Sequence, residues 1–240
     1  MIKSTITLSE EQIQFFQEHG YLQLEQISPP DEVNFLRGVY DRLFAEKAGR
    51  QQGAYFDAVS ADEDDNKPHT SPQIIDPVLF APELKKTIFR ANALAIAKQL
   101  LGSAAYGSFE HAILKPPGIG APTPWHQDEA FRRDYAPGYG EISIWMPLQP
   151  VDTTNGCMEF LPGSHRERVL RHASPGNDAR IHALTCVDDF DETKDSLCFQ
   201  QIEAEEGALH GGKTTIKLFG VTEVRHSIVK ADRGANRLLY

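Results

Sequence analysis

The spacing of apolar and polar residues predicts helices in the first part of the chain. The predicted helices cover residues 9–19, 30–47 and 82–101, each with apolar residues at helical spacing. Ser9 with Gln12 forms a capping-box pattern before the first helix, and Gly20 follows as a stop signal. Residues 21–25 read as a short strand, and the polar stretch 49–72 reads as a surface loop.

From residue 106 onward, short segments with strand composition follow one another between Pro and Gly turns. The predicted strands cover residues 107–115, 141–150, 157–161, 181–187, 197–203, 207–210 and 214–224. This succession is typical of an antiparallel sandwich or barrel. We therefore predict a single domain over 1–240, with a helical N-terminal part over 1–105 and a β-rich core over 106–240.

The composition narrows the class of protein. The chain has 240 residues, 40% of them hydrophobic and 24% charged, which is ordinary for a globular domain. The apolar runs fall short of the ~20 residues of a membrane span, and the N-terminus lacks the pattern of a signal peptide. A net charge of −10 argues against nucleic-acid binding. Three cysteines without a C-x-x-C pair fit reduced thiols.

These features predict a cytoplasmic protein without a nucleic-acid or membrane partner. Oligomeric state has no signal in the sequence.

The strongest candidate chemistry lies in the run Trp125-His126-Gln127-Asp128. Two residues that are two apart on a strand point to the same face, so His126 and Asp128 are expected to converge. One imidazole and one carboxylate are two ligands of the 2-His-1-carboxylate triad, which suits Fe(II) and leaves coordination positions open. H-x-D is a short motif, so its weight depends on the surrounding sequence.

The surrounding sequence resembles the phytanoyl-CoA dioxygenase family. Residues 141–165 read as a strand, a turn at Asn155-Gly156, a second strand and Pro-Gly-Ser-His, as in that family. Residues 114–118 and the short loop before His126 match the family's approach to its metal motif. Residues 8–22 look like its N-terminal signature. The likeness covers nearly the whole chain up to about residue 214.

The resemblance implies a mostly β fold with flanking helices. The core would be a double-stranded β-helix, which is a cupin-like jelly roll, with the N-terminal helices packed outside. It also implies Fe(II), 2-oxoglutarate as cosubstrate and O₂, in an enzyme that hydroxylates an aliphatic carbon of a small-molecule substrate. His126 and Asp128 carry over as iron ligands, and Trp145 lies where the family has an aromatic residue facing the site. His165 is expected in a structural turn, and Lys115 is interpreted as a solvated strand-end residue.

The resemblance breaks near the C-terminus. The family has a second histidine on a later strand and, shortly after it, an arginine whose guanidinium suits the distal carboxylate of 2-oxoglutarate. Residues 206–214 look like the approach to that histidine, but the expected register is occupied by Ile216, which cannot bind a metal.

Three explanations compete for this departure. The ligand is His226, with Arg237 eleven positions later as the clamp for 2-oxoglutarate. Alternatively the ligand is His210, which lies six positions before Ile216, or about 20 Å along an extended strand, so that a bulge would have to redirect it. In the third explanation, residues 215–240 are not the family's native ending, as after a shift of reading frame.

A different class of function follows if no second histidine is supplied. The chain would then be a catalytically silent jelly roll with impaired iron binding.

Overall fold

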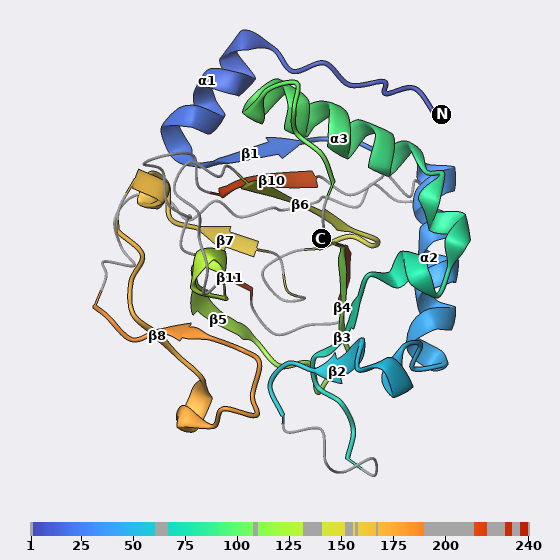
Figure 1. The fold of residues 1–240 in the computed structure, drawn as a ribbon, viewed down its shortest axis with the longest axis vertical. Helices are drawn as coiled ribbons and strands as arrows, with labels where there is room; N and C mark the ends of the chain where they lie inside the picture. Colours follow the sequence, from blue (N-terminus) through green and yellow to red (C-terminus); the bar gives the residue numbers. More distant parts are fainter. Residues whose placement is uncertain are drawn as a thin grey trace.

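The computed structural model describes residues 2–60, 67–107, 110–131, 141–151, 156, 158–166 and 168–189, together with the backbone of three later strands (Figure 1). Those strands are β10 (Thr214–Phe219), β11 (Val229–Ala231) and β12 (Asn236–Leu239). Among the described helices, none is long and apolar enough to cross a bilayer.

Three α-helices form close to the predicted positions. They are α1 (Glu10–His19), α2 (Pro30–Ala45) and α3 (Ile88–Leu101). The predicted capping box of α1 is confirmed, because the Ser9 side chain accepts from the Gln12 backbone N–H and the Gln12 side chain accepts from the Ser9 N–H. Gly20 ends this helix in the left-handed conformation, with φ of 80°.

The prediction of one continuous helix over 82–101 is wrong at its start. Pro82–Lys85 forms a separate 3₁₀ turn, and α3 begins after Thr87, whose side chain accepts from the Arg90 N–H. The Glu32 carboxylate accepts from the N–H groups of Ile88 and Phe89 at 2.6 and 2.8 Å. The first N–H groups of a helix have no partner within the helix, so a negative charge that accepts from them stabilises a helix start at this position.

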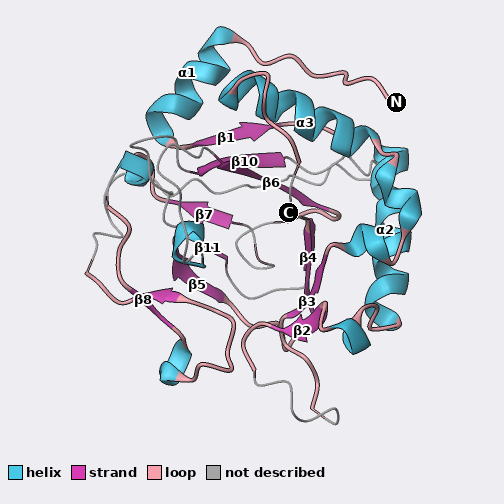
Figure 2. Cartoon of the chain, viewed as in Figure 1, coloured by secondary structure: helices cyan, strands magenta, loops and turns pink. Residues whose placement is uncertain are grey.

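The strands form two larger antiparallel sheets and one small ribbon (Figure 2). The seven-stranded sheet has the order β1-β10-β6-β12-β4-β3-β2, the three-stranded sheet β5-β11-β7, and the ribbon β8-β9. The remaining strands are β1 (Tyr21–Leu24), β2 (Tyr55–Asp57), β3 (Pro72–Ile75), β4 (His111–Lys115), β5 (Thr123–His126), β6 (Glu141–Pro147), β7 (Met158–Phe160), β8 (His172–Ala173) and β9 (Thr185–Cys186).

The predicted division at residue 105 differs from the structure. Strands β1, β2 and β3 come from the first 105 residues and join the same sheet as β4 and β6. The stretch 49–72, predicted as a loop, contains β2, because Tyr55 and Asp57 alternate inward with the half-buried Phe56. Predicted strands over 197–203 and 207–210 lie outside the described residues.

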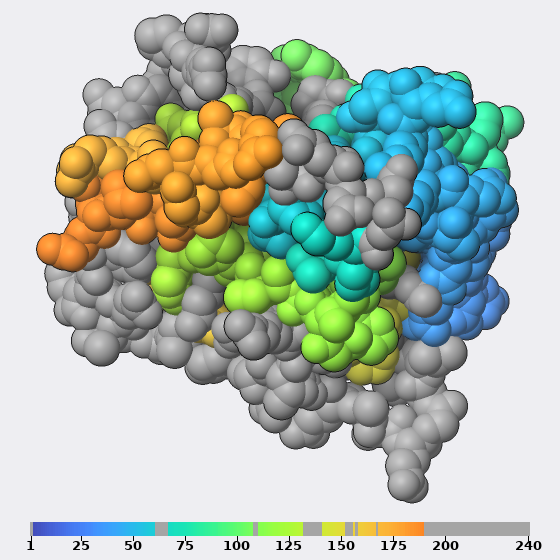
Figure 3. Space-filling view, turned by 90° about the horizontal axis from the view of Figure 1, so that it is seen from below, coloured from blue at the N-terminus to red at the C-terminus, as the bar shows by residue number. Residues whose placement is uncertain are grey.

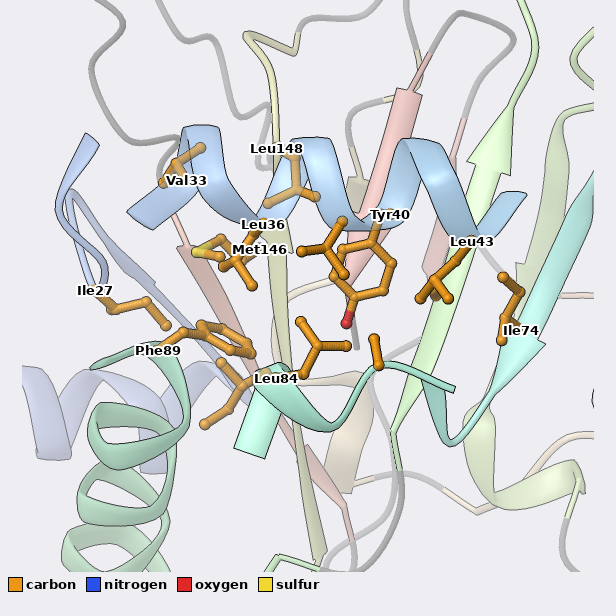
Figure 4. Packing of buried hydrophobic residues seen from close by; sticks show 14 of the residues in the cluster. Ile27, Val33, Leu36, Tyr40, Leu43, Ile74, Leu84, Phe89, Met146 and Leu148 are labelled. Atoms are coloured by element: carbon orange, nitrogen blue, oxygen red, sulfur yellow. The ribbon is translucent and has the colours of Figure 1, made fainter. Parts of the chain in front are cut away.

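The main hydrophobic core lies between the helices and the seven-stranded sheet. Along β6 and just after it, Ile144, Met146 and Leu148 alternate toward the helices. They belong to one cluster with buried residues of α2, such as Leu36 and Leu43, and Figure 4 shows Met146 and Leu148 close to Leu36. In Figure 1 the three helices lie on the outer side of this sheet, while β5 and β7 lie on its other side. Antiparallel sheets with α-helices on the outer side agree with the predicted fold class.

A buried carboxylate fixes the ends of the segment between β2 and β3. Asp57 is fully buried and accepts four backbone N–H groups, from Val59, Ser60, Thr70 and Ser71, at 2.6–3.2 Å. Backbone N–H groups can compensate the desolvation of a carboxylate when several of them converge on it. This contact holds both ends of the polar stretch against the sheet.

The last three strands enter different parts of the fold. Ile216 of β10 pairs with Leu22 of β1 and with Ile144 of β6. Strand β11 lies between β5 and β7, and its Val229 pairs with His126. Strand β12 lies between β6 and β4, and its Arg237 pairs with Leu114.

Candidate metal centre

The two residues of the H-x-D motif converge, by a different route from the one predicted. His126 is the last residue of β5, and Asp128 is the first residue of a 3₁₀ turn, Asp128–Phe131. The turn is closed by a hydrogen bond from the Ala130 N–H to the Gln127 carbonyl at 3.0 Å. The prediction that both residues lie on one strand is therefore wrong, since the strand ends between them. Their side chains nevertheless meet, with His126 Nε2 3.0 Å from Asp128 Oδ1.

The hydrogen bonds of His126 show what fits between the two side chains. Its Nδ1 lies 2.8 Å from the Pro124 carbonyl, which can only accept, so Nδ1 carries the proton. In the neutral imidazole, Nε2 then presents a lone pair toward a carboxylate oxygen. Two acceptors at this distance need a cation between or beside them, either a proton on Nε2 or a metal ion. A backbone carbonyl that fixes the second ring nitrogen is typical of metal-binding histidines.

The described residues hold two candidate ligands and not a third. Within them, no group of three or more His, Cys, Asp and Glu side chains is arranged to hold a metal ion. Both His210 and His226 lie outside the described residues, and for Arg237 only the backbone is described.

A large cavity opens beside the H-x-D motif. Its volume is about 1530 Å³, and His126 and Asp128 line it together with residues of β2, β3, β4 and β6. The cavity continues along α3, where apolar residues such as Leu94, Ala97 and Leu101 form its wall. The motif therefore faces a space large enough for a small-molecule ligand, with a polar end and an apolar end.

The polar end of the cavity carries two further histidines. His111 of β4 lies in the cavity wall, and burial lowers its pKa to about 4, against the opposing charge of Asp128. Phe56 lies between His111 and His182, with ring centroids 6.4 Å and 4.6 Å away. His111 is consequently neutral near pH 7, and the Phe56 ring lies between it and His182 in the cavity wall.

The residue between the two candidate ligands is held by its own contacts. Gln127 is fully buried, and its backbone N–H donates to His172 Nε2 at 2.9 Å. Its side-chain Oε1 accepts from the Leu170 N–H at 2.7 Å. Cys186 Sγ lies 3.1 Å from the same His172 nitrogen, and burial raises the pKa of this thiol to about 11. Burial also lowers the pKa of His172.

Three other residues singled out in the sequence are buried in the fold. Trp145 is fully buried and does not belong to the described cavity wall, although Ile144 and Ser143 do. His165 is buried in the turn after β7, where Nε2 donates to the Gln17 carbonyl at 3.1 Å, in agreement with the predicted structural role. The interpretation of Lys115 as a solvated residue is wrong. It is fully buried, and its Nζ donates to the Ala121 carbonyl at 3.0 Å.

Sequence reasoning missed the contacts of Gln127 and the surroundings of His111 and His172. His172 is 45 positions from Gln127 and belongs to no recognisable spacing. His111 differs from a surface histidine by facing the cavity, which only the pairing of β4 with β3 and β12 reveals.

Two known proteins with sequences similar to this chain are named as dioxygenases. The chain is 28% identical over 192 residues to phytanoyl-CoA dioxygenase 1 of Oryza sativa subsp. japonica, covering 69% of this chain and 68% of that protein. It is 29% identical over 166 residues to the ectoine dioxygenase of Bordetella bronchiseptica, covering 68% of this chain and 51% of that one. The chain thus spans between half and about two thirds of the length of these relatives.

Solved structures resemble the whole chain. EvdO2 from Micromonospora carbonacea var. aurantiaca, complexed with 2-oxoglutarate, is 30% identical with a TM-score of 0.72, covering 99% of this chain and 92% of that one. EctD from S. alaskensis with bound Fe is 18% identical with a TM-score of 0.64, covering 98% of this chain and 78% of that one. The second comparison shows a shared fold.

The model of the family described as phytanoyl-CoA dioxygenase (PhyH) matches residues 16–213, which include β5, the H-x-D motif and the Pro-Gly-Ser-His turn. By this match over most of its length, the chain belongs to the phytanoyl-CoA dioxygenase family.

Proposed function

We propose that this protein is a non-haem Fe(II)- and 2-oxoglutarate-dependent dioxygenase. The observation that carries the proposal is the approach of His126 Nε2 to Asp128 Oδ1 at the wall of a large cavity. The donor set of one imidazole and one carboxylate is two thirds of the facial triad of such enzymes. Family membership and the structures that hold 2-oxoglutarate and Fe support the same chemistry.

Bound Fe(II), with 2-oxoglutarate and O₂, would supply the oxidation of a substrate C–H bond to C–OH, with release of succinate and CO₂. The chain itself would hold the metal through His126 and Asp128 and keep the His126 ring oriented through the Pro124 carbonyl. The rings of Phe56, His111 and His182, which line the cavity beside the motif, would contact the substrate. We expect the hydroxylated atom to be an aliphatic carbon of a small molecule.

His226 is the proposed third ligand. Val229 of β11 pairs with His126 of β5, and His226 is three positions before it. Three residues span at most about 10 Å, so a ligand three positions before Val229 is compatible with the pairing of β11 and β5. The strand that pairs with β5 is β11, whereas β10, which carries Ile216, pairs with β1 and β6, and this supports a ligand from the segment before β11.

His210 is less well supported. It lies four positions before β10, whose neighbours are β1 and β6. A ligand from this position would have to cross toward β5 from a strand that does not pair with it.

Arg237 is proposed as the clamp for the distal carboxylate of 2-oxoglutarate, on its spacing from His226 and on the suitability of a guanidinium for a carboxylate. It pairs with Leu114, whose side chain packs toward the helix-side core, whereas the neighbouring Ile113 lines the cavity. This register does not itself favour the role. Trp145, proposed as a residue of the cosubstrate site, lies on the same strand as Ser143 of the cavity wall.

The second candidate function is that of a silent family member. It rests on the absence of a third ligand from the described residues and on the atypical sequence of residues 215–240. An altered reading frame in that segment stays a hypothesis, which the gene sequence of this protein and its close relatives would decide. We also propose that the protein is cytoplasmic and that it binds neither nucleic acid nor membrane.

An anaerobic titration tests the leading proposal. The apo-protein is titrated with Fe(II) and then with 2-oxoglutarate, while the visible metal-to-ligand charge-transfer band is followed. A band that saturates at one equivalent supports the dioxygenase, and succinate formation in air should follow. A folded protein that gives no band and forms no succinate would support the silent member instead.

A further inference from the structure

We propose that Gln127 and His172 are positioning residues that hold the backbone between the two metal ligands. The inference rests on the proposed metal-binding function. Gln127 separates His126 from Asp128, and β5 ends at this point. The backbone orientation at residue 127 therefore sets the directions in which both ligand side chains leave the chain.

The Gln127 side-chain amide forms hydrogen bonds with the backbone of the segment 168–170. Its Oε1 accepts from the Leu170 N–H at 2.7 Å, and its Nε2 donates to the Arg168 carbonyl at 3.4 Å. The residue is fully buried. A buried primary amide costs free energy unless it is hydrogen-bonded, so these contacts favour a single orientation of Gln127.

His172 holds the backbone of the same residue. Its Nδ1 lies 2.8 Å from the Leu170 carbonyl, so Nδ1 donates and Nε2 keeps its lone pair. That lone pair accepts the Gln127 backbone N–H at 2.9 Å. In many metal sites an outer group orients a ligating histidine by a hydrogen bond to its ring. Here the His172 imidazole would orient the two ligands through a hydrogen bond to the backbone between them.

The segment that carries His172 is itself fixed. His172 of β8 pairs with Cys186 of β9, and the Val187 N–H donates to the Arg171 carbonyl at 2.9 Å. Arg171 donates to the Asp188 carboxylate through its backbone N–H and its Nε at 3.0 and 2.6 Å. Figure 3 shows this segment, in orange, lying against yellow-green atoms, and β9 contacts β5, which ends at His126. The ribbon therefore provides a firm support for Gln127.

The test compares two substitutions at one position. His172→Leu removes the acceptor, whereas the carbonyl of His172→Gln can accept the Gln127 N–H from a position near Nε2. Binding of Co(II) alone to the full-length apo-protein is followed through its visible bands. We expect His172→Leu to weaken Co(II) affinity by about 10–100-fold, the usual effect of removing an orienting group, and His172→Gln to recover most of it.

Backbone hydrogen exchange of the metal-free protein gives an independent readout. The amide of Gln127 should exchange faster in His172→Leu and stay protected in His172→Gln, without a uniform change across the chain. Cys186→Ala removes the other contact of the same nitrogen and should leave Co(II) affinity unchanged. If His172→Leu does not fold, Gln127→Met removes the side-chain half of the contact and should weaken Co(II) binding similarly.

Equal Co(II) affinity in the folded wild type and His172→Leu would overturn the proposal, as would unchanged exchange at Gln127. A loss of affinity that His172→Gln does not recover would also overturn it. Failure of the wild type to bind Co(II) would count against the proposed function instead, and the exchange of the metal-free protein would still decide whether His172 holds Gln127.

Discussion

His126 Nε2 lies 3.0 Å from Asp128 Oδ1, while His126 Nδ1 is committed to the Pro124 carbonyl. The pair therefore presents one nitrogen lone pair and one carboxylate toward a common point. Either a proton on Nε2 or a metal ion at that point would satisfy both groups, so the geometry is compatible with a metal centre.

Removal of the carboxylate should abolish metal-dependent turnover. We expect Asp128→Ala to lose Fe(II) binding and the conversion of 2-oxoglutarate to succinate, because the proposed 2-His-1-carboxylate set loses its carboxylate. The measurement is succinate formation together with the charge-transfer band. Asp178→Ala is the matched control, since Asp178 is a carboxylate that pairs with Arg180 and is not part of the cavity wall. Full activity of Asp128→Ala would exclude the H-x-D motif as the iron site.

Two histidine substitutions should separate the candidates for the third ligand. His226→Ala is expected to eliminate the charge-transfer band, because β11 lies beside β5. His210→Ala should keep the band, because β10 lies between β1 and β6. The reverse result would require the segment before β10 to reach across to β5. If both variants keep the band, the metal is held by two protein ligands.

Acid should destabilise the protein through His165. Burial lowers the pKa of His165 below its ordinary value of 6.5, so the folded state favours the neutral ring. The stability that this neutral ring contributes is complete above pH 6.5 and is lost as the pH falls from 6.5 toward the lower pKa of the folded state. The free energy of unfolding, measured in urea from about pH 8 to about pH 5, should therefore fall on the acid side.

His165→Gln provides the comparison for this measurement. Its amide can still donate to the Gln17 carbonyl but does not titrate in this range. We expect the variant to lose less stability than the wild type between the two ends of the pH range. Parallel curves for the two proteins would mean that the acid sensitivity comes from other groups.

Asp57 should be required for stability rather than for chemistry. Asp57→Ala leaves four backbone N–H groups without their acceptor, and an unpaired buried group costs about 1–3 kcal/mol. We expect a loss of about 3 kcal/mol or more in the free energy of unfolding, measured by urea denaturation. Asp57→Asn keeps one acceptor oxygen and should lose less. An unchanged unfolding midpoint in Asp57→Ala would show that these N–H groups find other partners.

Much of the fold could be predicted from local patterns. The capping box at Ser9 and the left-handed stop at Gly20 are local features, and α1 begins and ends with them. The break before α3 was not predictable in this way, because it depends on Glu32, which lies 56 positions from Ile88 in the sequence. Strand β2 was also missed, since its inward residues alternate over only three positions.

The sequence by itself determined the chemistry that this protein has available: an imidazole and a carboxylate two positions apart, in surroundings that place the chain in its family. Local sequence could do so because ligand identity and turn formation depend on residues that are near each other in the chain. The tertiary structure alone decided that His126 and Asp128 meet across the end of a strand, that β11 rather than β10 lies beside them, and that Lys115 is buried. Those outcomes depend on strand pairing between distant segments, which no local pattern specifies.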